Sequence, residues 1–129
     1  MPIILLLVVT VFTAMMFTAC VDADYNVQAT KLQDAKYGYT VETVEYTLKP
    51  GSVWRVTANK GTGIEAQYVR IIYFGTEDAA IDYYYDEFLA YSLPALEVER
   101  PDLADKLTHE RVGKIVLYGT ADAVKDALA

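Results

Sequence analysis

The sequence predicts an α+β fold: a mostly antiparallel sheet of about five strands with helices mainly on one face. Three observations lead to this prediction. Stretches rich in β-branched and aromatic residues are separated by turn residues, as in strands joined by short loops. Other stretches repeat apolar residues at helical spacing. A strand-Gly-Thr-helix unit also occurs twice. The length of 129 residues suits a single domain.

The first half of the domain predicts one helix and three strands. Tyr25, Ala29 and Leu32 recur at near-helical spacing, and Gly38 follows as a stop signal, so a helix is expected over 24–36. Residues rich in Thr, Val and Tyr then indicate strands, which the turn Lys49-Pro50-Gly51-Ser52 and a glycine-containing loop separate. These strands are expected over 39–48, 53–58 and 66–74.

A second helix is expected to begin at Thr76, which can cap it, with Glu77 and Asp78 in the first turn at the positive end of the helix dipole. An α-helical repeat places five apolar or aromatic residues on one face and leaves Tyr83 pointing outward. The five residues are Ile81, Tyr84, Tyr85, Phe88 and Leu89.

The last third of the chain predicts a helical turn over 102–107, a strand hairpin and a helix. The hairpin strands are expected over 108–111 and 114–118, with the turn at Val112-Gly113. A short helix over 121–128 is expected to end the domain.

The two strand-to-helix units are copies of one pattern. Residues 70–80 match residues 114–124 at a constant offset of 44, in the order basic, aliphatic, aliphatic, bulky, aromatic, Gly, Thr. We therefore expect Thr76 and Thr120 to be N-caps and Gly75 and Gly119 to occupy equivalent turns.

The N-terminal segment indicates export. Residues 1–19 contain no charged side chain and are mostly aliphatic, and the small residues Thr18 and Ala19 precede the only cysteine, Cys20. Phe17-Thr18-Ala19-Cys20 resembles the lipobox of bacterial lipoproteins. That resemblance implies a signal peptide over 1–19 and a lipid on Cys20, followed by a tether over 20–24 and a single domain over 25–129. The expected location is the outer face of the cell membrane. An uncleaved membrane helix is the alternative, since about 18 apolar residues can span a bilayer.

The duplicated Gly-Thr-x-Asp-Ala unit and the tyrosine-rich helix before the second copy resemble small uncharacterised lipoproteins of Gram-positive bacteria. The similarity runs from about Leu32 to the end of the chain. It implies no activity.

Composition limits the range of functions. The net charge of −7 argues against nucleic acid as a partner, because phosphate binding needs clustered Lys and Arg. With Cys20 lipidated, His109 has no His or Cys partner for a zinc site or a nucleophilic pair, and its expected place is a surface strand. No metal, cofactor or catalytic residue is predicted.

Strand alternation points to one candidate surface. If the helices cover the face of Ile71 and Leu117, the other face is open and mixes cations with aromatic and aliphatic residues. Such a strip can bind an envelope protein, a peptide or a glycan by stacking and charge. The candidate residues are Arg55, Tyr68, Arg70, Ile72, Phe74, Lys114, Val116 and Tyr118.

The sequence thus favours a membrane-anchored, exported lipoprotein with a non-catalytic domain that binds a ligand or protein. Two alternatives stay open. One is a cell-envelope hydrolase that uses Asp and Glu, since the chain has 18 acidic residues. The other is a structural or accessory subunit with an uncleaved N-terminal helix.

Overall fold

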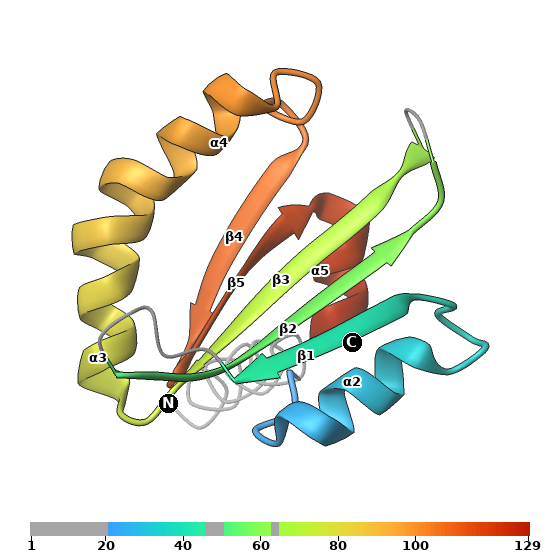
Figure 1. Cartoon of the computed structure of the whole chain (residues 1–129), viewed down its shortest axis with the longest axis horizontal. Coiled ribbons are helices and arrows are strands. Elements are labelled where there is room, and N and C mark those ends of the chain that lie inside the picture. The colour runs from blue at the N-terminus through green and yellow to red at the C-terminus, as the bar shows by residue number, and fades with distance from the viewer. Residues whose placement is uncertain (1–20, 46–50, 63–64) are drawn as a thin grey trace, which may run out of the picture.

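Five antiparallel strands form one sheet in the computed structural model of the chain (Figure 1). The structure describes residues 21–45, 51–62 and 65–129. The strand order is β1-β2-β3-β5-β4, and each neighbouring pair is antiparallel. The expected α+β class and five-stranded sheet are confirmed. The strands are β1 (Thr40–Glu45), β2 (Ser52–Lys60), β3 (Gln67–Phe74), β4 (Leu107–Val112) and β5 (Ile115–Thr120).

Three helical runs accompany the sheet in the described residues. The middle run is continuous and connects β3 to β4, and β5 lies between these two strands. Because β3 and β4 are each antiparallel to β5, they are parallel to one another. A helical turn was expected over 102–107, but residues 101–106 form turns and Leu107 begins β4. The helices are α2 (Tyr25–Gln33), α3 (Glu77–Asp82), η2 (Tyr83–Ser92), α4 (Leu93–Glu99) and α5 (Ala121–Leu128).

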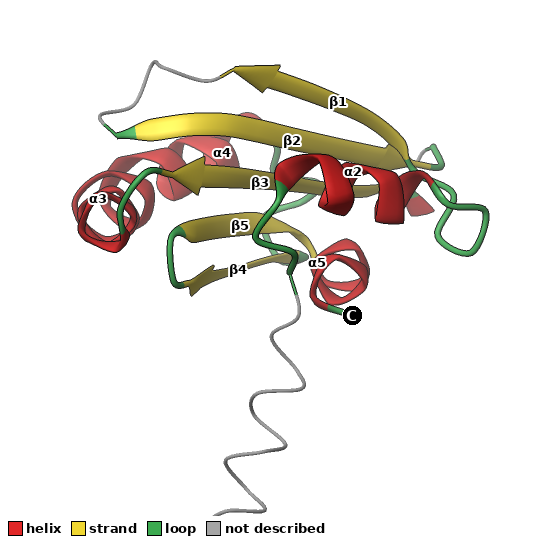
Figure 2. Cartoon of the chain, turned by 90° about the horizontal axis from the view of Figure 1, so that it is seen from below, coloured by secondary structure: helices red, strands yellow, loops and turns green. Residues whose placement is uncertain are grey.

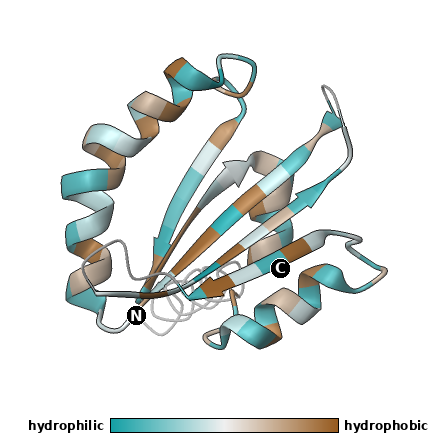
Figure 3. Cartoon of the chain, viewed as in Figure 1, coloured by the Kyte–Doolittle hydropathy of each residue, from teal (hydrophilic) through white to brown (hydrophobic). Residues whose placement is uncertain are grey.

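The helices cover both faces of the sheet, whereas the sequence predicted them mainly on one (Figure 2). Leu32 of α2 and Val124 of α5 share one buried cluster with Ile71. Phe88 of η2 shares a second cluster with Ile72, the next residue along β3, whose side chain points to the opposite face. Figure 3 shows hydrophobic residues along much of this central strand. Alternate residues of β3 are thus apolar on both sides, so each face needs a helical cover.

Within the middle helical run, the ten residues of η2 form a π-helix. Its i→i+5 hydrogen bonding brings residues five apart onto the same side, in place of the α-helical i and i+4. Tyr83 and Phe88, five residues apart, are accordingly buried, and Tyr85 is 56% exposed. The predicted helical face, with Tyr85 inward and Tyr83 outward, is therefore wrong at these two positions.

The two repeat units fold into similar but unequal junctions. Thr76 is the expected N-cap, and its hydroxyl accepts the backbone N–H of Ala79 at 3.1 Å. Thr120 also precedes a helix in extended conformation, but its hydroxyl makes no capping bond. It instead donates to Gln67 Oε1 at 2.7 Å and accepts the N–H of Tyr68 at 3.1 Å. The second copy therefore uses its threonine to fasten β5 to the start of β3.

The stretch expected as a tether, residues 20–24, is attached to the domain over its described part. The backbone N–H of Asp22 donates to Gln28 Oε1 at 2.9 Å, and the Tyr73 hydroxyl donates to the Asp22 carbonyl at 2.7 Å. Asp24 caps α2 by accepting the N–H groups of Asn26 and Val27. The signal peptide and Cys20 lie outside the described residues.

Candidate functional site

A cleft of about 400 Å³ lies between the start of β3 and the end of the middle helical run. We call it the arginine cleft, because two of the chain's four arginines line it. The sheet side contributes polar residues and a tyrosine, and the helical side contributes leucines and charged residues. Its lining consists of Asn59, Gly61, Ala66, Gln67, Tyr68, Arg70, Leu96, Glu99, Arg100 and Leu103.

Strand alternation places Arg70 and Tyr68 on the side of the sheet that η2 covers. Arg70 is opposite Thr57 of β2 and Tyr118 of β5, so it lies on the central strand with a neighbour on each side. η2 covers Ile72 and Phe74, which follow on the same face. Arg70 is half-buried at the edge of this cover, where the cleft opens.

Tyr68 forms an aromatic wall of the cleft. The Arg70 guanidinium carbon lies 5.8 Å from the centre of the Tyr68 ring, within the range of a cation–π contact. The Tyr118 ring meets Tyr68 edge-on, with 6.4 Å between the ring centres. Burial, followed by the nearby Tyr118, raises the pKa of Tyr68 well above its usual range, and Arg70 acts in the opposite direction. The Tyr68 hydroxyl therefore stays protonated and is a neutral donor at neutral pH.

Arg100 forms the outer lip of the cleft. Its Nε and Nη2 atoms donate to the two carboxylate oxygens of Asp102 at 3.2 and 3.0 Å. The hydrogen bonds from Arg100 keep the pKa of Asp102 below its usual value. Both side chains are exposed, so the pair holds the guanidinium at the entrance and leaves it accessible to solvent.

Polar groups extend from the cleft along β2. The Arg55 guanidinium lies 3.9 Å from a carboxylate oxygen of Glu42 on β1. Thr57 lies between the Arg55–Glu42 pair and Arg70. It is 9% exposed, and its hydroxyl has no hydrogen-bond partner among the described residues. This side of the sheet is thus polar towards β1 and apolar beneath η2.

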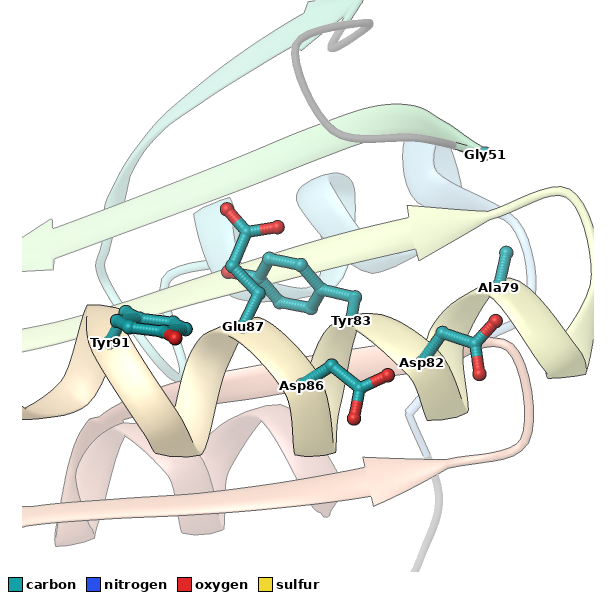
Figure 4. Close-up of a pocket in the computed structure, with 7 residues that line it drawn as sticks. All are labelled: Gly51, Ala79, Asp82, Tyr83, Asp86, Glu87 and Tyr91. Atoms are coloured by element: carbon teal, nitrogen blue, oxygen red, sulfur yellow. The ribbon is translucent and has the colours of Figure 1, made fainter.

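A second cleft, of about 500 Å³, is acidic (Figure 4). Figure 4 shows its helical side chains on successive turns of α3 and η2, next to Gly51, the turn residue before β2. Asp82 and Asp86 are exposed, and Glu87 is half-buried. The lining residues are Gly51, Ala79, Asp82, Tyr83, Asp86, Glu87 and Tyr91.

His109, expected on a surface strand, is partly covered by η2. Its Nδ1 is 2.6 Å from the hydroxyl of Tyr84, and its ring meets Phe88 edge-on. Burial is the main reason that the pKa of Tyr84 is raised, so the Tyr84 hydroxyl stays protonated and shares a hydrogen bond with the imidazole. The pair fastens β4 to the helix above it.

The open binding strip predicted from sequence is not open. Its residues do share one side of the sheet, but η2 covers most of the apolar ones, and only Tyr68 and Arg70 of the strip line the arginine cleft. Lys114 is exposed at the other end of β5, and Arg55 is half-buried. The prediction was wrong because four large apolar side chains form the floor of a second core. These are Ile72 (1% exposed), Phe74 (4%), Val116 (0%) and Tyr118 (8%).

Sequence reasoning missed the part of the cleft that comes from the helical side. Leu96 and Arg100 lie 28 and 32 residues from Tyr68 in the chain, and only the β3-to-β4 crossover brings them together. The half-cleft on β3 could be found from strand alternation, whereas its other half depends on the length and path of the helix.

Comparisons with known proteins return no match: no family model, no curated protein and no solved structure is similar to this chain. In the part of the chain that the structure describes, no three His, Cys, Asp or Glu side chains come together as a metal site. None of the described helices has the length and apolar character needed to cross a bilayer.

Proposed function

We propose that the chain is an exported lipoprotein, anchored through Cys20, whose domain binds a ligand with a free carboxylate in the arginine cleft. The carboxyl end of a peptide is such a ligand. The observation that supports this proposal is the placement of Arg70 and Arg100 around one cavity beside the ring of Tyr68. Guanidinium groups pair with carboxylates through charge-assisted hydrogen bonds, and an aromatic wall accepts an apolar side chain by stacking.

Size and charge both support this assignment. A volume of about 400 Å³ lies within the range of small-molecule sites, roughly 300–1,000 Å³. The chain as a whole has a net charge of −7, yet two guanidinium groups line this one cavity, together with the carboxylate of Glu99. Arg100 is also paired with Asp102 at the entrance. The two guanidinium groups are the donors that we assign to the carboxylate of the ligand.

Binding is favoured over hydrolysis by the exposure of the aspartates in the acidic cleft. A glycosidase needs a carboxyl group whose pKa burial raises, so that it can donate a proton. Asp82 and Asp86 of the acidic cleft are exposed, and that cleft lies beside Gly51, away from the arginine cleft. We therefore assign the domain a binding role.

Ligand binding can be tested on the full chain in detergent micelles by calorimetric titration. The probe is N-acetylphenylalanine, which has the groups of a peptide carboxyl end, and its matched control is the uncharged N-acetylphenylalaninamide. We expect the acid to bind and the amide to bind at least tenfold more weakly. Arg70→Ala should weaken binding of the acid by roughly ten- to a hundredfold, because a hydrogen bond to a charged group contributes about 1.5–3 kcal/mol.

Arg111→Ala is the matched control, since it removes the same charge from β4, where Arg111 pairs with Glu77 at 3.3 Å, outside the cleft. Equal affinity for the acid and the amide, or an equal loss in both variants, would refute the proposed site.

The anchor is tested separately by mass spectrometry of protein from the membrane fraction. We expect a chain that starts at Cys20 and carries acyl mass, and a Cys20→Ala chain that is uncleaved or released. An intact Met1 together with a free thiol would exclude lipidation.

A further inference from the structure

A buried side chain attaches the first described residues to the domain. Gln28 is 0% exposed, and its Oε1 accepts the N–H of Asp22 while its Nε2 donates to the carbonyl of Ala127 in α5. A buried amide with both ends bonded is costly to disrupt, because breaking either bond leaves an unpaired polar group. Gln28 thus ties the N-terminal stretch to both α2 and α5.

A second contact holds the same residue from the sheet side. The Tyr73 hydroxyl donates to the Asp22 carbonyl at 2.7 Å, so both backbone groups of Asp22 are bonded to the domain. Val21, directly after Cys20, is half-buried and packs against the cluster of α2 and α5. One residue therefore separates Cys20 from the attached residue Asp22, and a residue spans at most about 3.6 Å.

The attachment and the arginine cleft lie at opposite ends of β3. Tyr73, near the end of β3, holds Asp22, whereas Tyr68, near its start, lines the cleft. Five residues of strand separate them by roughly 17 Å. They also belong to opposite faces of the sheet, since Tyr73 packs with the cluster of α2 and α5 and Tyr68 with the cluster of η2.

We propose that this attachment holds the domain directly on the lipid surface, with the end of β3 towards the bilayer and the arginine cleft facing away from it. The inference rests on the proposed lipid anchor at Cys20. A freely jointed tether lets a domain turn in any direction, whereas an anchor one residue from Asp22 fixes which end is near the lipid. The cleft then stays open to ligands that arrive from outside the membrane.

The experiment measures two positions on the full, lipidated chain in phosphatidylcholine vesicles. Lys114→Cys marks the bilayer end, because the Lys114 carbonyl accepts the N–H of Phe74 at the end of β3, and Lys114 is exposed. Asn59→Cys marks the cleft end, where Asn59 is opposite Tyr68 and exposed. The lipid occupies the Cys20 thiol, so each variant takes a single fluorophore. We expect spin-labelled lipid headgroups to quench the label at position 114 at least twofold more than the label at position 59.

A variant with six Gly and Ser residues inserted between Cys20 and Val21 is the matched control, because it keeps the attachment of Asp22 and adds slack, roughly 13 Å on average. The quenching difference should shrink in this variant, while the insertion alone, in a chain that keeps Asn59 and carries no label, leaves binding of N-acetylphenylalanine unchanged. Equal quenching at the two positions of the original chain, or a difference that the insertion leaves intact, would overturn the proposed orientation. A second labelled thiol would instead show that Cys20 carries no lipid, so failure of the anchor is recognised separately.

Discussion

Gly119 and Gly75 hold the same position in the sequence repeat, but only one of them is required by the structure. A Cβ atom at Gly119 would lie 2.0 Å from the Tyr68 carbonyl oxygen and 2.7 Å from the Cα atom of Val69. Gly119 also has a φ of 158°, which L side chains rarely adopt. At Gly75 the nearest atom to such a Cβ is 3.8 Å away, an ordinary contact.

Gly119→Ala should accordingly destabilise the fold by at least about 2 kcal/mol, because backbone atoms of β3 cannot yield without disturbing the pairing of β3 with β5. Gly75→Ala is the matched control and should change stability by about 0.5 kcal/mol or less. Urea denaturation of both variants, followed by circular dichroism, measures the difference. Similar losses at the two positions would mean that the two junctions are equivalent after all.

The candidate site shows what single residues reveal in a sequence. The period of two along a strand placed Arg70 and Tyr68 together on one side, and the structure does bring both to the arginine cleft. The same period could not tell whether Ile72 and Phe74 beside them face water or a helix. Whether a helix covers them depends on the path of the crossover between β3 and β4, and this path cannot be predicted from local sequence patterns.

At the scale of elements, η2 shows why the helical face was misjudged. The existence of a helix after Thr76 followed from its cap and its acidic first turn, and both are present. The buried face of this helix was predicted on the assumption of an α-helical period. Because η2 is a π-helix, Tyr83 turns inward over Phe74, with 5.2 Å between the ring centres, and Tyr85 turns outward. The strands, in contrast, were predicted well because β-branched and aromatic residues between turn residues identify them locally.

The π-helical face predicts unequal effects of two neighbouring tyrosines. Tyr83→Ala should destabilise the fold by about 3–5 kcal/mol, as truncation of a large buried aromatic side chain does. Tyr85→Ala, at a side chain that is 56% exposed, should cost about 1 kcal/mol or less. Thermal and urea denaturation of the two variants provide the comparison. A larger loss for Tyr85 would restore the α-helical face and contradict η2 as described.

On the scale of the whole molecule, the sheet is the shared wall of two cores. One core lies beneath α2 and α5 and the other beneath η2, and β3 and β5 contribute alternate residues to each. Three tyrosines link this framework to its polar surroundings. The Tyr39 hydroxyl donates to Asp126 at 2.7 Å, Tyr73 holds Asp22, and Tyr68 lines the arginine cleft.

The raised pKa values of these three tyrosines predict that the free energy of unfolding falls in alkali. Burial is the main cause that raises the pKa of Tyr39, Tyr68 and Tyr73 above the usual value of about 10. The folded chain then holds protons that the unfolded chain releases, so the stabilisation is complete below pH about 10 and is lost as pH rises beyond it. Urea denaturation at several pH values between about 8 and about 11 should show the free energy of unfolding falling only above pH about 10. Replacing each of the three by Phe should make that fall shallower, whereas Tyr85→Phe, at an exposed side chain, should not. If the fall is equally steep in all four variants, ionisation of the buried tyrosines is not what unfolds the protein.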